Sequence, residues 1–332
     1  MWFKNTSELT ILNLLYLQMK NKLKTEESNI TTKTEFVLLW FSDIPNLQWI
    51  LFGMFLVISL SILMSNSIII LITRIDSSLQ TPKYFFLSNF SFLEICYVIL
   101  GAIPRLLMDL LTQKGSISFL ACATQMCFVL MLGVTECLLL AAMAYDRYVA
   151  ICDPLHYPLV MNHKVCVQLV TASWISGVPA VIGQTCQIFS LPFCGSNRIN
   201  HFFCDIPPVL KLACGDTFVN EIPVYVAAVV FIMVPLLLIV VSYGKIISNI
   251  LKLSSASGRA KAFSTCSSHL IVVVLFDGTA TMTYLQPKPN QSERLGKLIS
   301  LFYTVLTPTL NPIVYTLRNK DIMVALRKLF GY

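Results

Sequence analysis

Seven long apolar runs, separated by short polar segments, dominate the chain. They cover 49–72, 84–104, 122–145, 165 to about 186, 222–244, 262–286 and 298–317. A helix needs roughly 20 mostly apolar residues to cross the hydrocarbon core of a bilayer, and each run is about that long. The pattern therefore predicts an all-α membrane protein, a seven-transmembrane-helix bundle over residues 48–317.

The segment after the last run predicts one further, shorter helix. Its sequence, LRNKDIMVALRKLFGY, places apolar side chains on one face and basic side chains on the other. That pattern is typical of an amphipathic helix lying along a membrane surface. We expect such a helix within the tail 318–332.

The composition supports lipid as the surrounding solvent. Hydrophobic residues make up 56% of the 332, charged residues only 12%, and the mean hydropathy is +0.72. Soluble domains carry about 25% charged residues, so this chain has too few polar groups to cover its apolar surface. The net charge of +7 does not indicate nucleic acid, because no basic cluster with interleaved aromatic residues occurs in a polar context. Basic loops beside membrane lipids account for the charge.

The charges between the runs indicate the orientation. An odd number of spans places the two termini on opposite sides, and basic residues favour the cytoplasmic side. With the N-terminus outside, the inner segments hold 12 Lys and Arg residues against four acids, and the outer segments hold 12 against ten. We therefore expect an extracellular N-terminal tail, residues 1–47, and a cytoplasmic tail, residues 318–332.

The N-terminal tail contains acceptor patterns for N-glycosylation, a modification of lumenal chain segments. Asn5-Thr6-Ser7 and Asn29-Ile30-Thr31 both fit. Asn29 lies in a polar stretch and is the glycosylation site that we expect. Its position agrees with an N-terminus outside the cell.

The cysteines fall into two groups. Cys186, Cys194, Cys204 and Cys214 lie between the fourth and fifth runs, on the outer side of this topology, where an oxidising environment favours disulfides. Cys122 opens the third run at the same face and is placed to tether that helix to the loop. Five is an odd number, so at least one of these cysteines is expected to be unpaired. The other six lie in or near membrane helices and are expected to act as small apolar residues.

The chain contains none of the short motifs that mark common catalytic sites. We find no HExxH zinc motif, no phosphate-binding loop and no paired CxxC, and the polar segments are too short for a catalytic domain. We therefore expect no enzyme, no cofactor and no metal centre.

Three acids interrupt the apolar runs, namely Glu94, Glu136 and Asp277. Ionisable groups inside a membrane are candidate functional residues, which makes a transporter or channel the main alternative. Transporters usually contain internal repeats, and seven spans do not divide into two equal halves. Glu94 and Glu136 are candidates for a polar or cation site that sets a conformational equilibrium, or for hydrogen-bonded structural acids.

Two further motifs lie at the inner ends of helices. Asp146 and Arg147 end the third run, where an arginine also occurs simply because it reaches toward the membrane interface. TPTLNPIVY in the seventh run contains Pro308 and Pro312, which remove backbone donors and bend the helix.

Together the motifs resemble those of the olfactory receptor family, within the rhodopsin-like G-protein-coupled receptors. The resemblance covers about residues 29–330. The segments that carry it are PKYFFLSNFSFLEICY (82–97), MAYDRYVAIC (143–152), LPFCGSNRINHFFCDIPPVLKLAC (191–214), KAFSTCSSHL (261–270) and PTLNPIVYTLRN (308–319).

The resemblance implies a receptor that binds small volatile odorants and couples to a stimulatory heterotrimeric G protein of the olfactory type, raising cyclic AMP. It implies the plasma membrane, in the cilia of olfactory sensory neurons. The residues that match the family's activation and G-protein-coupling motifs are Asp146, Arg147, Tyr148, Lys261, His269, Asn311, Pro312 and Tyr315. It favours a Cys122–Cys194 disulfide with Cys186–Cys204 as a second, and leaves Cys122–Cys204 open.

Helical spacing suggests which residues face an odorant pocket in the outer half of the bundle. Residues three and four apart share one face of a helix, and from Cys122 inward this face runs through the third span. The predicted pocket residues are Met126, Val129, Leu130, Gly133, Phe231, Asp277, Thr281, Tyr284 and Thr304.

The chain departs from the family pattern at three positions. Glu94 stands where the family usually has aspartate, and Ser65 precedes Asn66 where a glycine is usual. Phe276-Asp277-Gly278 replaces the frequent Phe-Tyr-Gly. Asp277 is therefore either an anchor for a basic or hydrogen-bonding odorant, or a change that alters basal activity or damages the receptor.

Overall fold

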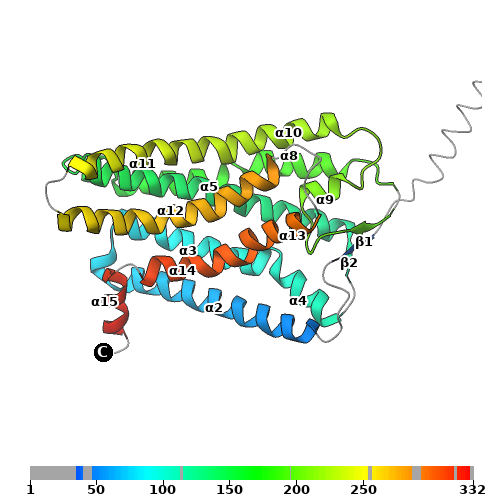
Figure 1. Cartoon of the computed structure of the whole chain (residues 1–332), viewed down its shortest axis with the longest axis horizontal. Helices are drawn as coiled ribbons and strands as arrows, with labels where there is room; N and C mark the ends of the chain where they lie inside the picture. The colour runs from blue at the N-terminus through cyan, green and yellow to red at the C-terminus, as the bar shows by residue number, and fades with distance from the viewer. Residues whose placement is uncertain are drawn as a thin grey trace, which may run out of the picture.

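A computed structural model describes residues 35–39, 47–112, 115–194, 196–252, 256–285, 293–317 and 320–329. The expected glycosylation site, Asn29, lies outside these residues. Within them, seven helices are long and apolar enough to cross a membrane, which confirms the predicted bundle. The spans are Leu47–Ile75, Pro82–Thr112, Phe119–Cys152, His163–Phe189, Phe218–Lys252, Cys266–Tyr284 and Leu295–Tyr315. Figure 1 shows them packed lengthwise as one elongated bundle.

Several spans consist of more than one helical element. The first, third and sixth spans are single helices, α2 (Leu47–Ile75), α5 (Phe119–Cys152) and α12 (Ala256–Tyr284). The second span consists of α3 (Pro82–Leu100) and α4 (Ile103–Thr112), and the fourth of α7 (His163–Ile175) and α8 (Val178–Phe189). The fifth consists of α10 (Phe218–Ala228), η2 (Val229–Met233) and α11 (Val234–Lys252), and the seventh of α13 (Glu293–Leu301), η3 (Phe302–Leu306) and α14 (Thr307–Leu317). The connecting elements are η1 (Ser77–Leu79), α6 (Tyr157–Val160) and α9 (Ile206–Leu210). The short helix α15 (Lys320–Leu329) follows the last span.

Local irregularities divide these spans. Between α3 and α4 the helix breaks at Gly101, where a β-carbon would overlap the carbonyl oxygen of Tyr97. The fifth and seventh spans each contain a stretch of π-helix, η2 and η3. Such stretches widen a helix locally and occur often at functional sites. Pro312 lies inside α14, as the sequence predicted for a bent seventh helix.

A small sheet, which the sequence pattern did not predict, covers one end of the bundle. Its central strand β1 (Glu35–Leu38) pairs antiparallel with β2 (Ser116–Ser118) and parallel with β3 (Arg198–Ile199). We call this end the sheet end. Helix α15 lies at the other end of the bundle, here called the tail end (Figure 1).

The disulfides differ from the pairing that the family resemblance favoured. Cys122 pairs with Cys204, and Cys194 pairs with Cys214, so the expected bonds Cys122–Cys194 and Cys186–Cys204 are wrong. Cys186 is free and exposed, which makes it the unpaired cysteine that the odd count required.

Local backbone pairing explains this outcome. An antiparallel bridge between Phe193 and Ala213 brings the two segments together, and Cys194 and Cys214, which each follow one of the bridged residues, have their Cα atoms 5.4 Å apart. The amide of Cys194 donates to the carbonyl of Leu212 at 3.1 Å beside this bridge. Cys204 is therefore left for Cys122, and its amide donates to the side chain of Gln125 in α5 at 3.0 Å.

The packing is that of a protein surrounded by lipid. The main hydrophobic core runs along the bundle axis between α3, α5, α11, α12 and α14. On α11, Leu237 and Leu238 expose more than half of their surface, and Val240 and Val241 do the same. Large apolar side chains exposed side by side indicate an apolar environment around the bundle. At the tail end, α15 buries Ile322 and Ala325 against the bundle, which confirms its amphipathic character.

Candidate functional site

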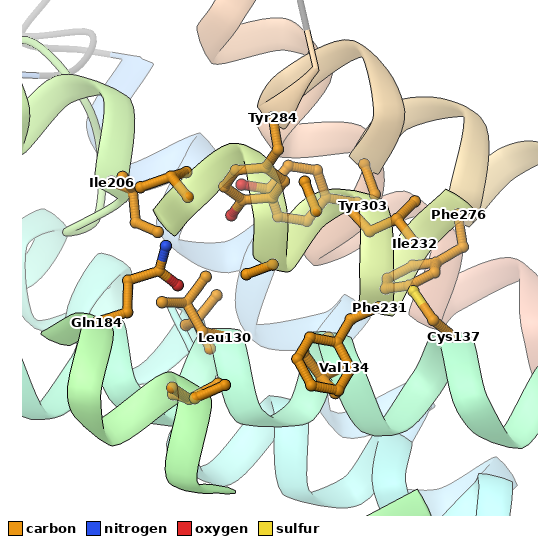
Figure 2. A pocket seen from close by; sticks show the side chains of 18 of the residues that line it. Leu130, Val134, Cys137, Gln184, Ile206, Phe231, Ile232, Phe276, Tyr284 and Tyr303 are labelled. Atoms are coloured by element: carbon orange, nitrogen blue, oxygen red, sulfur yellow. The ribbon is translucent and has the colours of Figure 1, made fainter. Parts of the chain in front are cut away.

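A pocket lies within the half of the bundle nearer the sheet end. Its empty volume is about 710 Å³, counting the space that opens to its surroundings. The residues that line it are Tyr97, Val129, Leu130, Gly133, Val134, Cys137, Ala180, Val181, Gln184, Ile206, Val224, Ala227, Ala228, Phe231, Ile232, Phe276, Ala280, Tyr284 and Tyr303. The lining is mostly apolar, with few polar groups at fixed places (Figure 2).

Five of the nine predicted pocket residues line this pocket, namely Val129, Leu130, Gly133, Phe231 and Tyr284. The α5 face was predicted from helical spacing, and the same spacing continues inward to Val134 and Cys137.

The other four predicted residues lie elsewhere. Met126 is fully buried in the hydrophobic cluster under the sheet. Thr304 donates from its hydroxyl to the carbonyl of Ser300 at 2.6 Å, so its polar group is used within its own helix. Thr281 and Asp277 stand on α12 outside the lining, and the hydroxyl of Thr281 is buried with no partner among the described residues.

A paired carboxylate joins the loop to two helices beside the pocket. Asp205 is 2% exposed and directly follows the disulfide-bonded Cys204. The hydroxyls of Tyr284 in α12 and Tyr303 in η3 each donate to one of its oxygens at 2.8 Å. The backbone amide of Ile206 donates to it at 2.8 Å as well. Burial raises the pKa of Asp205 above its ordinary value, and these hydrogen bonds act in the opposite direction.

His201 extends this polar network toward the seventh span. Its ring nitrogen Nε2 lies 3.1 Å from the hydroxyl of Ser300, and Nδ1 lies 3.2 Å from the carbonyl oxygen of Phe203. Burial lowers the pKa of His201 to about 4, so the ring is neutral at physiological pH. The network fastens the loop between α8 and α10 to the helices that form the pocket.

Three further acids are buried deeper in the bundle. Glu94 accepts a hydrogen bond from the side-chain amide of Asn311, so the sequence-predicted polar site includes a residue of the seventh span. Glu136 interacts electrostatically with both Glu94 and Asp277. The donors beside these acids in the part of the chain that the structure describes are the phenol of Tyr97 for Glu136 and the thiol of Cys137 for Asp277. Among the described residues, no group of three or more His, Cys, Asp and Glu side chains is arranged to hold a metal ion.

The residues matched to the activation motifs lie near the tail end and along the axis of the bundle. Asp146 accepts a hydrogen bond from Tyr157 at 2.8 Å and interacts electrostatically with Arg147. Arg147 is buried and interacts electrostatically with His269 and Tyr315. The structure therefore brings the third, sixth and seventh spans together around one arginine.

Other members of this set take structural positions around the arginine. Tyr315 is buried, and its ring meets the ring of Phe90 edge-on at 5.8 Å. Tyr148 packs against the hydrophobic core. Lys261 lies on α12, but its side chain is not among those that the structure describes.

Sequence comparisons identify the family. The sequence profile of the olfactory receptor family matches residues 54–331. Olfactory receptor 10AG1 of Homo sapiens is 77% identical to this chain over 297 residues, which cover 90% of the chain and 98% of that protein. The chain belongs to the olfactory receptor family. Olfactory receptors 10A7 and 10A5 of Homo sapiens are 52% and 53% identical, over 90% and 91% of the chain and 95% of each relative.

The comparisons confirm the resemblance that the motifs indicated. The receptor is a rhodopsin-like G-protein-coupled receptor and a multi-pass membrane protein. The family consists of receptors, so the prediction that the chain is not an enzyme is confirmed as well.

Sequence reasoning missed the parts of the receptor's pocket that depend on folding. Gln184 comes from α8, and Ile206 and the neighbouring Asp205 come from the loop, where helical spacing carries no information about direction. Tyr303 lies in the π-helical stretch η3, where the spacing of an ordinary helix no longer applies. The available signal was the run Cys204-Asp205, because a bridged cysteine fixes the position of its neighbours.

Proposed function

We propose that the receptor binds small volatile odorants in the pocket between α5, α8, η2, α12 and η3, and that binding activates a stimulatory heterotrimeric G protein of the olfactory type, raising cyclic AMP. The observation that carries the proposal is the pocket itself. Its lining is apolar apart from a few groups such as Gln184, Tyr284 and Tyr303, which suits small apolar molecules bearing one or two polar atoms.

The helix α12 provides a route from the pocket to the G protein. At one level it lines the pocket with Phe276, Ala280 and Tyr284. Two turns nearer the tail end, its His269 lies 2.9 Å from the hydroxyl of Tyr243 in α11 and interacts electrostatically with Arg147. A ligand that shifts α12 therefore changes the surroundings of Arg147. The ligand shifts the equilibrium only by its difference in affinity for the two states.

The coupling residues are the set at the tail end. Arg147 engages the G protein in the active state and is held near Asp146 at rest. Asn311 and Pro312 give the seventh helix two arrangements, because a proline leaves an unpaired carbonyl in the helix, and Tyr315 follows them. Tyr148, Lys261 and the buried His269 complete the coupling set.

The disulfides and the charges of the loops support one orientation of the receptor in the membrane. Both disulfides lie in the segments at the sheet end, and disulfides persist in oxidising compartments. We assign the sheet end to the extracellular side, with Asn29 glycosylated, and the receptor to the ciliary plasma membrane of olfactory sensory neurons.

A pocket-filling variant with a matched control tests the proposal. Ala228 lines the pocket, whereas the next residue, Val229, is 48% exposed on the outside of the bundle. Cells that express the receptor and a cyclic AMP reporter are exposed to a chemically diverse panel of volatiles. Ala228→Phe is expected to abolish the responses at unchanged surface expression, and Val229→Phe is expected to keep them. Equal responses from both variants, or no response of the wild-type receptor to any volatile, would count against the proposal.

A further inference from the structure

The geometry points to a protonated amine as a ligand of this receptor, with Asp277 as the group that binds its charge. This inference rests on the proposed function, because it assigns the chemical class of odorant that the same pocket takes. Asp277 is fully buried on α12, directly after Phe276, which lines the pocket.

The neighbours of Asp277 place it behind the inner wall of the pocket. Its carboxyl group interacts with the thiol of Cys137, and Cys137 and Phe276 are both lining residues. Figure 2 shows these two side chains together at one end of the pocket, away from Gln184 and Ile206. Rotation of the Cys137 thiol away from Asp277 exposes the carboxylate to a ligand in the pocket.

Asp277 is an exception among the buried aspartates that the structure describes. Asp109 forms an ion pair with Arg105 at 2.6 Å, and Asp146 accepts from Tyr157 at 2.8 Å. Asp205 accepts from two tyrosine hydroxyls. Asp277 alone of these four has no cation, hydroxyl or amide donor, and the thiol of Cys137, a weak donor, is the hydrogen-bonding group beside it.

A buried carboxylate with only a weak thiol donor beside it is costly, and a cation is the partner that offsets this cost best. The charged and titratable groups near Asp277 also favour a cation as its partner. Glu136 on α5 interacts with it electrostatically and itself interacts with Glu94 on α3 and with the phenol of Tyr97. Within the described residues, no basic side chain interacts with Asp277. Acids and no basic side chains of the described residues surround this point, so an ammonium group is favoured there and a carboxylate ligand is disfavoured.

The rest of the pocket limits the size of the amine. Val134, Phe231 and Ile232 provide an apolar wall around the inner end. The aromatic faces of Phe231 and Phe276 also attract a cation. At the other end the amide nitrogen of Gln184 is buried with no partner among the residues described. A small primary amine with a short apolar body, with or without a distal hydrogen-bond acceptor, fits these features.

The first test uses the wild-type receptor and pairs of ligands that differ only in charge. Primary aliphatic and arylalkyl amines are compared with the alcohols of the same skeleton and with their uncharged N-acetyl derivatives, in the cyclic AMP assay. The amines are expected to be at least about tenfold more potent than their uncharged counterparts, the loss typical of removing one charged hydrogen bond.

The second test uses two isosteric variants on the same helix. Asp277→Asn removes the charge, and Thr281→Val removes a buried, unpartnered polar group one turn away. Asp277→Asn is expected to lower amine potency at least about tenfold and to leave the potency of alcohols within about threefold. Thr281→Val is expected to change amines and alcohols alike. Asp277→Glu keeps the charge and is expected to keep the preference for amines.

The outcomes separate this inference from the proposed function. If uncharged volatiles activate the receptor but amines have no advantage, the amine inference is overturned and the odorant receptor stands. It is also overturned if Asp277→Asn weakens both ligand classes equally. If Asp277→Asn does not reach the cell surface, the wild-type ligand pairs and Asp277→Glu decide. Silence toward both classes at normal surface expression overturns both proposals.

Discussion

Asp205 and Asp277 are buried beside the same pocket, yet their surroundings differ completely. Asp205 accepts hydrogen bonds from Tyr284, Tyr303 and the amide of Ile206, whereas Asp277 has only the thiol of Cys137, a weak donor, beside it among the described residues. A fully paired buried group helps to specify one structure, and an unpaired one lowers stability unless something else pairs with it. The first carboxylate therefore holds the loop on the bundle, and the second is available to a ligand.

The largest loss of stability is expected from removing the disulfide between Cys122 and Cys204, the residue that precedes Asp205. The Cys122–Cys204 bond closes a sequence separation of 82 residues, and Cys194–Cys214 closes one of 20. Chain entropy assigns about 4–5 kcal/mol to the first bond and about 3 kcal/mol to the second. The double variant Cys122→Ser/Cys204→Ser is expected to lower the thermal unfolding temperature of the purified receptor more than Cys194→Ser/Cys214→Ser does.

Cys186→Ser is the control for these variants, because Cys186 is free and exposed. It is expected to leave the unfolding temperature unchanged. If both double variants were as stable as this control, the loop would be held by contacts other than its disulfides.

The next largest effect is expected from Asp205→Asn. One oxygen of the carboxylate becomes an amide group, so one tyrosine hydroxyl loses its acceptor inside the protein, which costs about 1–3 kcal/mol. The unfolding temperature is expected to fall. The control is Asp216→Asn, an exposed aspartate of the same loop. Equal stability of the two variants would show that the tyrosine hydroxyls find other partners.

A smaller effect is expected from pH, through His201. Burial lowers the pKa of His201 to about 4, and the nearby Lys297 acts in the same direction. The ordinary pKa of histidine is about 6.5, so the unfolded chain takes up a proton on acidification before the folded receptor does. The resulting stability is complete above about pH 6.5 and is lost as the pH falls toward 4. Between pH 7.5 and 5.5 the loss amounts to about 1 kcal/mol.

His201→Gln tests this linkage, since glutamine does not titrate. Unfolding temperatures are measured from pH 7.5 to 5.5 for both proteins. The difference between them is expected to shrink as the pH falls. A difference that stays constant over this range would assign the acid sensitivity to other groups.

The smallest effect is expected from Asp277→Asn in the absence of ligand. Only the weak interaction with the thiol of Cys137 changes, so the free energy of unfolding is expected to change by less than about 0.5 kcal/mol or to rise. The measurement is the same thermal unfolding, with Asp205→Asn in parallel. A loss as large as that of Asp205→Asn would reveal a structural partner for Asp277 and remove the contrast between the two aspartates.

The spans and the axial polar residues could be predicted from the sequence because their signals are local. The length of an apolar run identifies a membrane helix, and residues spaced three to four apart identify the face of that helix that points into the bundle. Val129, Leu130 and Gly133 were found in this way, and all three line the pocket. An acid within an apolar run is conspicuous for the same reason, which is how Glu94, Glu136 and Asp277 were found.

The sheet, the disulfide pairing and the paired carboxylate could not be predicted because they depend on contacts between distant segments. The sequence around Cys204 and Cys214 does not indicate which of the two pairs with Cys122. Only the pairing of Phe193 with Ala213 decides which of them is left for Cys122. Likewise Tyr303, in the π-helical stretch η3, lines the pocket, whereas the predicted Thr304 next to it does not.

The three-stranded sheet also fixes an order of events during synthesis. Its central strand β1 is made before every membrane span, but it pairs with β3 in a loop that the ribosome reaches only after four spans. The side chain of Asn197 donates to the carbonyl of Glu35 across 162 residues of sequence. At about 5–20 residues per second, β1 waits on the order of 10–30 seconds for this partner. During that interval the strand edge is open to chaperones and to neighbouring nascent chains.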